Sequence, residues 1–316
     1  MPLVETLGLR KTYPSGGGLV GLTLSIAEGQ TYGFVGPDGA GKTTLLRILC
    51  GILRPTAGEV KVLGVDVRRR PESVKPHLGY MAQRFALYGD LTVLENLRFF
   101  GALFGTPRTE VEENLERLLN FAQLWPFRSR LAKCLSGGMK QKLALCCTLI
   151  HTPRLLILDE PTIGVDPVSR QEFWSMLQPL PARGTSIVVS TGYLEEAERC
   201  DRVAFLHQGG LLMEGPPEDL RASFDGMLLE VCGDDLRGAK RVLEALAIVD
   251  GVQLFGDRLH LFLRHAQTEM AVAGIEAALN AAGLAGASIR AIKPRLEDIF
   301  IERLSAGKES PRHDCR

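Results

Sequence analysis

The sequence lacks an excess of either charge, because 37 lysine and arginine residues are matched by 37 aspartate and glutamate residues. A balanced chain of 316 residues has no overall field that would draw it to nucleic acid or to an anionic membrane. Any such partner would have to be held by a local feature. We therefore expect no nucleic-acid partner.

Paired cysteines and long apolar runs are also missing. The seven cysteines include no C-x-x-C pair, and Cys146 and Cys147 are adjacent in an apolar run, which argues against a disulfide or zinc framework. No apolar run approaches the roughly 18 residues that span a bilayer, and the N-terminus has no signal-peptide pattern. We expect a chain that resides in the reducing cytoplasm without a membrane span of its own.

The chain of 316 residues is long enough to form two domains. In the first, over residues 1–220, apolar segments at 30–35, 155–158 and 186–189 predict strands of a mostly parallel α/β sheet. Periodic leucines predict a helix over 42–53. Thr92 and Glu95 have the spacing of a capping box, which opens a helical insert in pieces over 93–123.

The pattern changes after Gly215, where two prolines follow. Strands and helices alternate from there on, and they predict a small α+β domain over 221–304, with an accessory or regulatory role. The expected strands are 227–231, 252–255, 259–263 and 287–292, and the expected helices are 235–247 and 268–282. The polar residues 305–316 predict a disordered tail.

A glycine-rich motif lies between the first predicted strand and helix. It reads Gly36, Pro37, Asp38, Gly39, Ala40, Gly41, Lys42, Thr43 and Thr44, and it matches G-x-x-x-x-G-K-[ST]. The glycines allow backbone N–H groups to turn toward phosphates, and the helix adds its positive N-terminus. Lys42 adds a charge, and Thr43 can ligate Mg²⁺. The motif predicts a site for Mg²⁺ and ATP.

An acidic pair, Asp159 and Glu160, follows the predicted strand 155–158. Asp159 is placed to hold the Mg²⁺ ion, and Glu160 is placed to act as the base that orients the attacking water. The alternative is that the two acidic residues only contact solvent at the end of a strand. It does not explain why the glycine-rich motif and the acidic pair occur in the order that a nucleotide site requires.

Together with the segment from Leu135 to Lys142, these motifs make the chain similar to the nucleotide-binding subunit of ATP-binding-cassette (ABC) transporters. The resemblance implies that Ser136, Gly137 and Gly138 bind the γ-phosphate of a partner's ATP. It implies that Gln83 reaches Mg²⁺ and the attacking water, that Tyr13 stacks on adenine, and that Asp166 lies at a dimer interface.

The resemblance covers residues 1 to about 220 and implies the fold of a P-loop NTPase. Its expected parts are an N-terminal antiparallel β subdomain, a mostly parallel core and a helical insert. It also implies a second ABC ATPase domain that closes head to tail on two ATP molecules. That domain could come from a homodimer, a heterodimer or a tandem half of one chain.

Three segments, 79–83, 87–93 and 293–300, look like those of export systems with ABC-2 type permeases. The nearest resemblance is to the first ATPase half of tandem multidrug exporters, which implies a permease partner and a possible periplasmic adaptor. The chain would then lie on the cytoplasmic side of the cell membrane, held there through the permease.

Two positions depart from the family pattern. Asp38 stands where asparagine is usual, and a carboxylate beside phosphates adds repulsion unless it points away. Gly192 stands where the family has its switch histidine, and glycine cannot contact the γ-phosphate or position Glu160. We expect Mg-ATP binding with weakened hydrolysis at this chain's own site, while the Ser136 segment serves a partner's site.

The alternative function is an ABC ATPase that drives no transport, either ribosome-associated or a regulatory ATP-binding module. Ribosome-associated chains usually carry two cassettes and a basic arm, and this chain shows neither. A regulatory module remains open if both sites of a homodimer lack the histidine.

Overall fold

The computed structural model describes residues 2–84, 87–263, 268–284 and 286–309. It divides the chain into two compact units, Met1–Pro216 and Pro217–Arg316, each of which is described by itself. The boundary lies before the expected position at residue 220, so helix α7 (Pro217–Ala222) belongs to the second unit.

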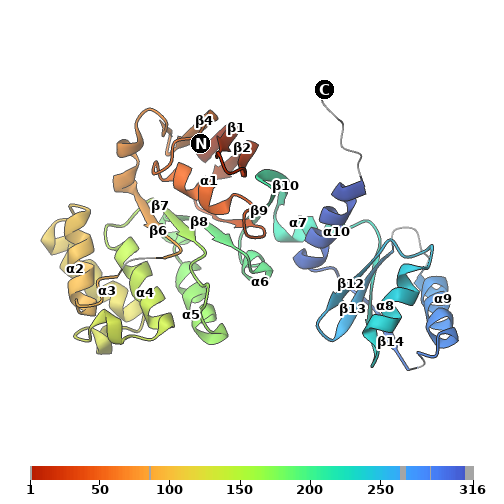
Figure 1. Cartoon of the computed structure of the whole chain (residues 1–316). Coiled ribbons are helices and arrows are strands. Elements are labelled where there is room, and N and C mark those ends of the chain that lie inside the picture. Colours follow the sequence, from red (N-terminus) through yellow and green to blue (C-terminus); the bar gives the residue numbers. More distant parts are fainter. Residues whose placement is uncertain (1, 85–86, 264–267, 285, 310–316) are drawn as a thin grey trace. The chain divides into compact units, whose positions relative to one another are not determined.

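The centre of the first unit is a six-stranded sheet in the order β10-β9-β3-β8-β7-β6 (Figure 1). Its neighbours from β9 to β6 are parallel, and β10 pairs antiparallel with β9. The strands are β3 (Thr31–Val35), β6 (Leu78–Met81), β7 (Leu155–Asp159), β8 (Ser186–Thr191), β9 (Arg202–His207) and β10 (Gly210–Gly215). Every residue of β3, β7 and β8 is buried, which is why these strands read as continuous apolar runs. The predicted mostly parallel α/β core is confirmed.

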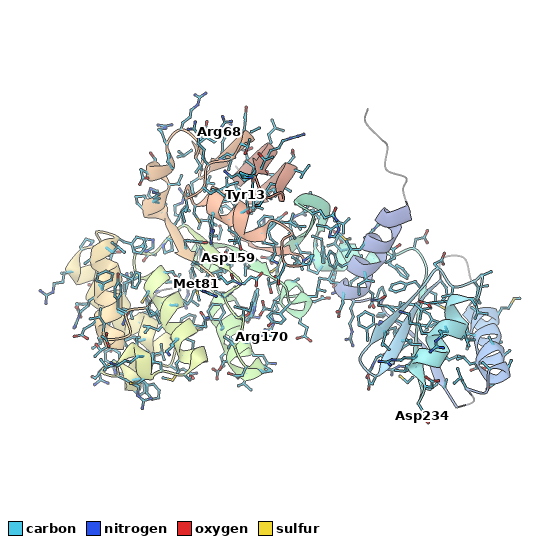
Figure 2. The ribbon with its side chains drawn as sticks, viewed as in Figure 1. Tyr13, Arg68, Met81, Asp159, Arg170 and Asp234 are labelled. Carbon is cyan, nitrogen blue, oxygen red and sulfur yellow. The ribbon has the colours of Figure 1, made fainter. Side chains whose placement is uncertain are left out.

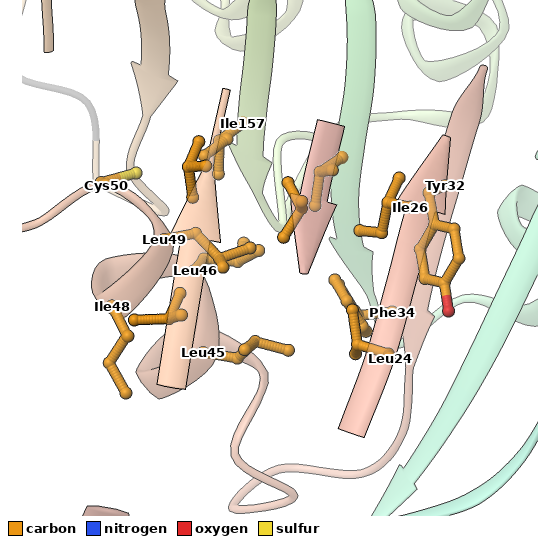
Figure 3. Packing of buried hydrophobic residues seen from close by; sticks show 14 of the residues in the cluster. Leu24, Ile26, Tyr32, Phe34, Leu45, Leu46, Ile48, Leu49, Cys50 and Ile157 are labelled. Carbon is orange, nitrogen blue, oxygen red and sulfur yellow. The ribbon is translucent and has the colours of Figure 1, made fainter. Parts of the chain in front are cut away.

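A second, antiparallel sheet in the order β2-β1-β4-β5 forms the N-terminal β subdomain. It consists of β1 (Pro2–Thr12), β2 (Gly18–Ala27), β4 (Ala57–Val62) and β5 (Val65–Asp66). One hydrophobic cluster joins residues of this sheet, of the parallel sheet and of helix α1 (Lys42–Leu49), as Figure 3 shows. Leu45, Leu46, Ile48 and Leu49 are all fully buried in it.

Helix α1 ends earlier than the predicted 42–53. Cys50 caps its C-terminus, and Gly51 adopts φ 67°, a left-handed conformation that stops the helix. The apolar residues Ile52 and Leu53 continue the helical pattern in sequence, so hydrophobic periodicity alone predicted a helix that was too long.

The predicted helical insert forms two helices, α2 (Val93–Leu103) and α3 (Arg108–Phe121), and α2 begins at the expected capping box of Thr92 and Glu95. Both helices contact α4 (Gly137–Leu149), and Figure 1 shows the three gathered away from the N-terminal sheet. The other α-helices of this unit are α5 (Pro167–Leu177) and α6 (Leu194–Ala197). Short 3-10 turns are η1 (Pro71–Ser73), η2 (Lys75–His77), η3 (Trp125–Phe127), η4 (Ala132–Cys134) and η5 (Pro181–Arg183).

The second unit contains an antiparallel sheet in the order β12-β13-β11-β14. In chain order its elements are β11 (Met227–Cys232), α8 (Leu236–Glu244), β12 (Gly251–Phe255), β13 (Arg258–Leu263), α9 (Thr268–Ala281) and β14 (Ser288–Ile292). This β-α-β-β-α-β arrangement is the split, ferredoxin-like topology. All of the strands and helices expected between 227 and 292 are present, although α8 ends before the expected residue 247.

One face of this sheet packs its leucines and valines against α8 and α9. The other face buries polar groups, since His260 Nδ1 lies 2.6 Å from Asp298 Oδ1 of α10 (Leu296–Glu309). Helix α10 was not expected, and it includes the first residues of the segment 305–316 that the sequence assigned to a disordered tail. Residues 310–316 lie outside the described residues. Among the described helices, none is long and apolar enough to cross a bilayer.

Candidate functional site

Gly36 and Gly41 shape the loop that leads from β3 into α1. A Cβ atom on Gly36 would lie 2.2 Å from the carbonyl oxygen of Leu206. A Cβ atom on Gly41 would lie 2.8 Å from the Leu19 side chain, and Gly41 also adopts φ 100°. Only glycine therefore fits at both positions. No side chain caps the start of α1, so its first N–H groups are available to an anion such as a phosphate.

Lys42 is buried at the first position of α1 and points back into the loop. Its ammonium group donates hydrogen bonds to the carbonyl oxygens of Gly36 at 2.7 Å and Pro37 at 3.2 Å. It also lies 3.1 Å from Glu160 Oε1. The predicted phosphate-binding lysine and the predicted base are thus in direct contact, and an incoming phosphate would compete with Glu160 for this cation.

Asp159 and Thr43, the two predicted metal ligands, are brought together at the carboxyl end of β7. The Thr43 hydroxyl donates to Asp159 Oδ1 at 3.0 Å, and the Ser190 hydroxyl donates to the same oxygen at 2.7 Å. Asp159 is 1% exposed. Ser190 at the end of β8 was not among the predicted site residues, because a serine in a buried strand gives no distinctive signal in the sequence.

This donor set suits Mg²⁺. Mg²⁺ prefers oxygen ligands, and proteins often hold it through one or two side chains together with substrate phosphates. Thr43 and Asp159 supply two such oxygens. Among the described residues no group of three or more His, Cys, Asp or Glu side chains gathers that could hold a metal ion, so the remaining ligands would be phosphate oxygens and water.

Glu160 begins a turn at the end of β7 and adopts φ 48°, which is unusual for a residue other than glycine. Its N–H group donates to the hydroxyl of Ser190 at 3.0 Å and lies 3.1 Å from the Ser190 carbonyl oxygen. Ser190 therefore fixes both acidic residues of the pair.

Tyr13 lies next to the phosphate loop, with its hydroxyl 3.3 Å from the Thr44 hydroxyl. Tyr13 as a whole residue is 37% exposed, and the Lys11 ammonium group lies 5.4 Å from the centroid of its ring. Figure 2 shows Tyr13 on the side of the N-terminal sheet, with Asp159 deeper in the unit. An exposed ring at this edge is suited to stacking on an adenine base. Asp38 and Gly39 are exposed, so the Asp38 carboxylate faces solvent and its repulsion is screened.

Gly192 follows β8, which pairs with β3 on one side and with β7 on the other. Thr191 is the register partner of Val35, and Ser190 is the partner of Asp159. Gly192 therefore lies at the strand ends that carry the phosphate loop and the acidic pair. A Cβ atom at this position would meet no heavy atom within 4 Å, so there is room for a side chain that the sequence does not supply.

The Ser136 segment opens α4, in a part of the unit other than the phosphate loop. The Ser136 hydroxyl accepts a hydrogen bond from the Met139 N–H at 3.3 Å, which makes it the N-cap of α4. Gly137 and Gly138 form the first turn, and a Cβ atom on Gly138 would lie 2.4 Å from the Ser169 hydroxyl. This helix start is the second predicted anion site.

Asp166 caps α5 beside that helix start, because its carboxylate accepts a hydrogen bond from the Ser169 N–H at 2.9 Å. This bond lowers the pKa of Asp166 below its usual range. Gln83 lies after β6 and lines a pocket together with Gly137 and Gly164. Gln83, Ser136 and Asp166 thus belong to neighbouring loops, and their roles toward nucleotide stay predictions.

Fold and site together define an ATP-binding cassette: a P-loop between β3 and α1, an acidic pair at the end of β7 in the same parallel sheet, and a helical insert. The sequence profile of the ABC transporter family matches residues 19–163. The chain belongs to the ATP-binding proteins of ABC transporters.

It is 39% identical to the probable multidrug ABC transporter ATP-binding protein YbhF of Escherichia coli, over 96% of this chain and 53% of that protein. The chain therefore spans about half the length of this relative. It is 35% identical to the Nod factor export ATP-binding protein I of Ralstonia nicotianae, over 95% of this chain and 93% of that protein.

The structure also resembles a dimeric ATP-binding cassette solved in a post-hydrolysis state with ADP and Pi. The TM-score is 0.61 at 27% identity, with 67% of this chain and 98% of that chain covered. ATP binding and an ABC-type ATPase are thus supported by sequence and by structure.

Proposed function

We propose that this chain is the ATPase subunit that powers export through an ABC-2 type permease. The observation that carries the proposal is that the start of α1 meets the carboxyl end of β7, where Lys42 lies 3.1 Å from Glu160 and the Thr43 hydroxyl donates to Asp159. The export assignment is supported by the names of relatives that cover nearly the whole chain, such as the Nod factor export protein.

In this proposal each residue of the site has a separate role toward the phosphates, the metal ion, the attacking water or the adenine. The loop amides and Lys42 bind the β- and γ-phosphates. Thr43, Asp159 and Gln83 would hold the Mg²⁺ ion, whose charge would offset that of the phosphates. Glu160 leaves Lys42 when phosphate arrives, and it then orients the attacking water as a general base. Tyr13 stacks on the adenine.

A second ABC ATPase domain completes the site. Ser136, Gly137 and Gly138 at the start of α4 would bind the γ-phosphate of that partner's ATP, with Asp166 at the shared interface. The partner can be a second copy of this chain, a different subunit or another half of a longer chain. The related cassette with ADP and Pi, which is dimeric, supports this arrangement.

We further propose that Gly192 weakens hydrolysis at this chain's own site, because it leaves a gap where a side chain could reach the γ-phosphate. The test is the ATPase turnover of the unaltered chain beside that of Gly192→His, with Glu160→Gln as the inactive control. Faster turnover in Gly192→His supports the proposal. Brisk turnover of the unaltered chain that Glu160→Gln abolishes contradicts it.

The chain would act on the cytoplasmic side of the membrane, held there by the permease, with a periplasmic adaptor possible in the full system. Co-purification of the tagged chain with a membrane permease tests this partner. Sedimentation with ribosomes instead would favour the ribosome-associated alternative. The second unit would serve as an accessory or regulatory domain.

A further inference from the structure

Glu196 is a carboxylate buried outside the predicted site, on the short helix α6, with only 1% of the residue exposed. A buried carboxylate is costly unless it is paired. Hydroxyl groups on two different segments donate to it: Thr162 to Oε1, and Thr191 to Oε2 at 2.6 Å. Arg170 Nε of α5 lies 3.6 Å from Oε1.

The first of these partners belongs to the turn that Glu160 begins. Within that turn the Ile163 N–H lies 3.3 Å from the Glu160 carbonyl oxygen, and the Val165 N–H lies 3.1 Å from the Thr162 carbonyl oxygen. These bonds tie Thr162 and Glu160 into one unit. A side chain that holds Thr162 therefore holds the far end of the turn.

Glu160 needs such support because of its backbone. Its φ of 48° is a left-handed conformation that a non-glycine residue keeps only when its surroundings impose it. Ser190 holds the near end of the turn through the Glu160 N–H. Glu196 holds the far end through Thr162.

The second partner lies directly before Gly192. The Thr191 hydroxyl donates to Glu196 and accepts a hydrogen bond from the Tyr193 N–H at 2.9 Å. The Arg170 guanidinium lies 3.8 Å from the centroid of the Tyr193 ring, so the residue after Gly192 is held as well. Figure 2 labels Arg170 and Asp159 in the first unit.

We propose that Glu196 is a positioning residue for ATP hydrolysis. It holds Glu160 through Thr162 and holds the turn at Gly192 through Thr191. Since Gly192 brings no side chain, this buried carboxylate aligns the two turns that face each other across the ends of β7 and β8. The inference rests on the proposed role of Glu160 as the base.

The sharpest test is Thr162→Val, which removes one hydroxyl and keeps the shape of the side chain. In single-turnover assays with excess protein we expect the rate of hydrolysis to fall about tenfold or more, since a misplacement of a catalytic group by about 1 Å can cost about a hundredfold. The apparent affinity for ATP should stay within about twofold, because Thr162 is not placed to touch the nucleotide. A purely structural role would not separate the two quantities.

Thr185→Val is the matched control. Thr185 is equally a buried threonine, and its hydroxyl donates to the Pro153 carbonyl oxygen at 3.0 Å, at the opposite end of β8. Both variants lose one buried hydrogen bond, and the unfolding temperature should fall at least as far in Thr162→Val, because its hydroxyl donates to a carboxylate and that of Thr185 donates to a neutral carbonyl. Only Thr162→Val should lose rate.

Glu196→Gln keeps the volume of the side chain and should also lower the rate of hydrolysis. If Glu196→Gln does not fold, Thr162→Val alone tests the role of Glu196. A rate in Thr162→Val equal to that of Thr185→Val overturns the role of Glu196. Glu160→Gln separates the two failures: hydrolysis that survives this change overturns the assignment of the base itself.

Discussion

Asp159 in the first unit and Glu230 in the second unit are both buried carboxylates, but they are paired in opposite ways. In the first unit Asp159 receives hydrogen bonds from the hydroxyls of Thr43 and Ser190. In the second unit Glu230 is bound by the guanidinium groups of Arg258 and Arg290. Hydroxyl partners leave the negative charge of a carboxylate uncancelled and available to a metal ion, whereas guanidinium partners neutralise it. The first arrangement suits chemistry, and the second suits structure.

The second unit carries a further pair of this structural kind. His260 Nδ1 lies 2.6 Å from Asp298 Oδ1, and the other oxygen of Asp298 accepts a hydrogen bond from the Arg295 N–H at 2.8 Å. This carboxylate, 1% exposed, joins the start of α10 to the sheet. Asp298 lies in the segment 293–300, whose sequence resembles that of export systems with ABC-2 type permeases.

The largest effect should come from Asp159→Asn. Loss of the negative charge beside Thr43 removes a strong oxygen ligand for Mg²⁺, and we expect ATP turnover to fall about a hundredfold or more. Steady-state phosphate release measures it. Asp298→Asn, a change of the same chemistry at a structural carboxylate, should leave turnover within about twofold. Equal losses of ATP turnover in Asp159→Asn and Asp298→Asn would contradict the distinction between a carboxylate that serves the reaction and one that serves only the structure.

The next effect concerns stability. Asp298→Ala leaves the buried His260 Nδ1 without its partner and removes the acceptor of the Arg295 N–H before α10, and a buried unsatisfied group costs about 1–3 kcal/mol. We expect faster hydrogen exchange in α10 and in β13, with the phosphate loop unchanged. Asp257→Ala, which removes an exposed carboxylate beside Arg258, is the control and should change stability by less than about 0.5 kcal/mol.

Glu230 should make the second unit sensitive to acid. Burial raises the pKa of this carboxyl, but the hydrogen bonds and charges of Arg258 and Arg290 outweigh it, so the pKa lies below 4.5 in the folded unit. A lowered pKa gives stability that is complete above pH 4.5 and is lost as the pH falls through the folded value. Unfolding of Glu230→Gln, followed between neutral and acid pH, should show a shallower pH dependence. An unchanged profile would contradict this.

The smallest of these effects should come from the adenine contact. Tyr13→Ala should weaken ATP binding by about 1 kcal/mol, the low end of the range for stacking of a base on an aromatic ring, because Tyr13 lies at an exposed edge. Tyr13→Phe keeps the ring and loses only the long contact with the Thr44 hydroxyl, so its affinity should be close to that of the unaltered chain. Titration with ATP distinguishes the two. Equal losses would mean that the hydroxyl, and not the ring, makes the contact.

The difference between local and long-range features of the site explains what could be predicted from the sequence. The phosphate loop is local: its glycines, Lys42 and Thr43 are consecutive, and each has a distinctive role at its own position. The parallel core was predictable because β3, β7 and β8 are buried on both faces and therefore mostly apolar, with polar residues only at their ends.

The support of the site could not be predicted in this way. Ser190, Thr191 and Thr162 look like ordinary polar residues in sequence, and their importance comes from contacts with Asp159 and Glu196 more than 30 residues away or across a turn. The end of α1 was missed because Ile52 and Leu53 continue the apolar pattern beyond Gly51. Helix α10 was missed because what fixes it, the bond from His260 to Asp298, joins distant segments.

The most direct test of the account is the binding of Mg-ATP to the unaltered chain and to Lys42→Ala, measured by isothermal titration at one salt concentration. The account predicts one ATP per chain, and an affinity at least about tenfold weaker in the variant, because the buried cation at the start of α1 meets the phosphates. Equal affinities in the two proteins would contradict the claim that ATP binds in the loop from Gly36 to Thr44.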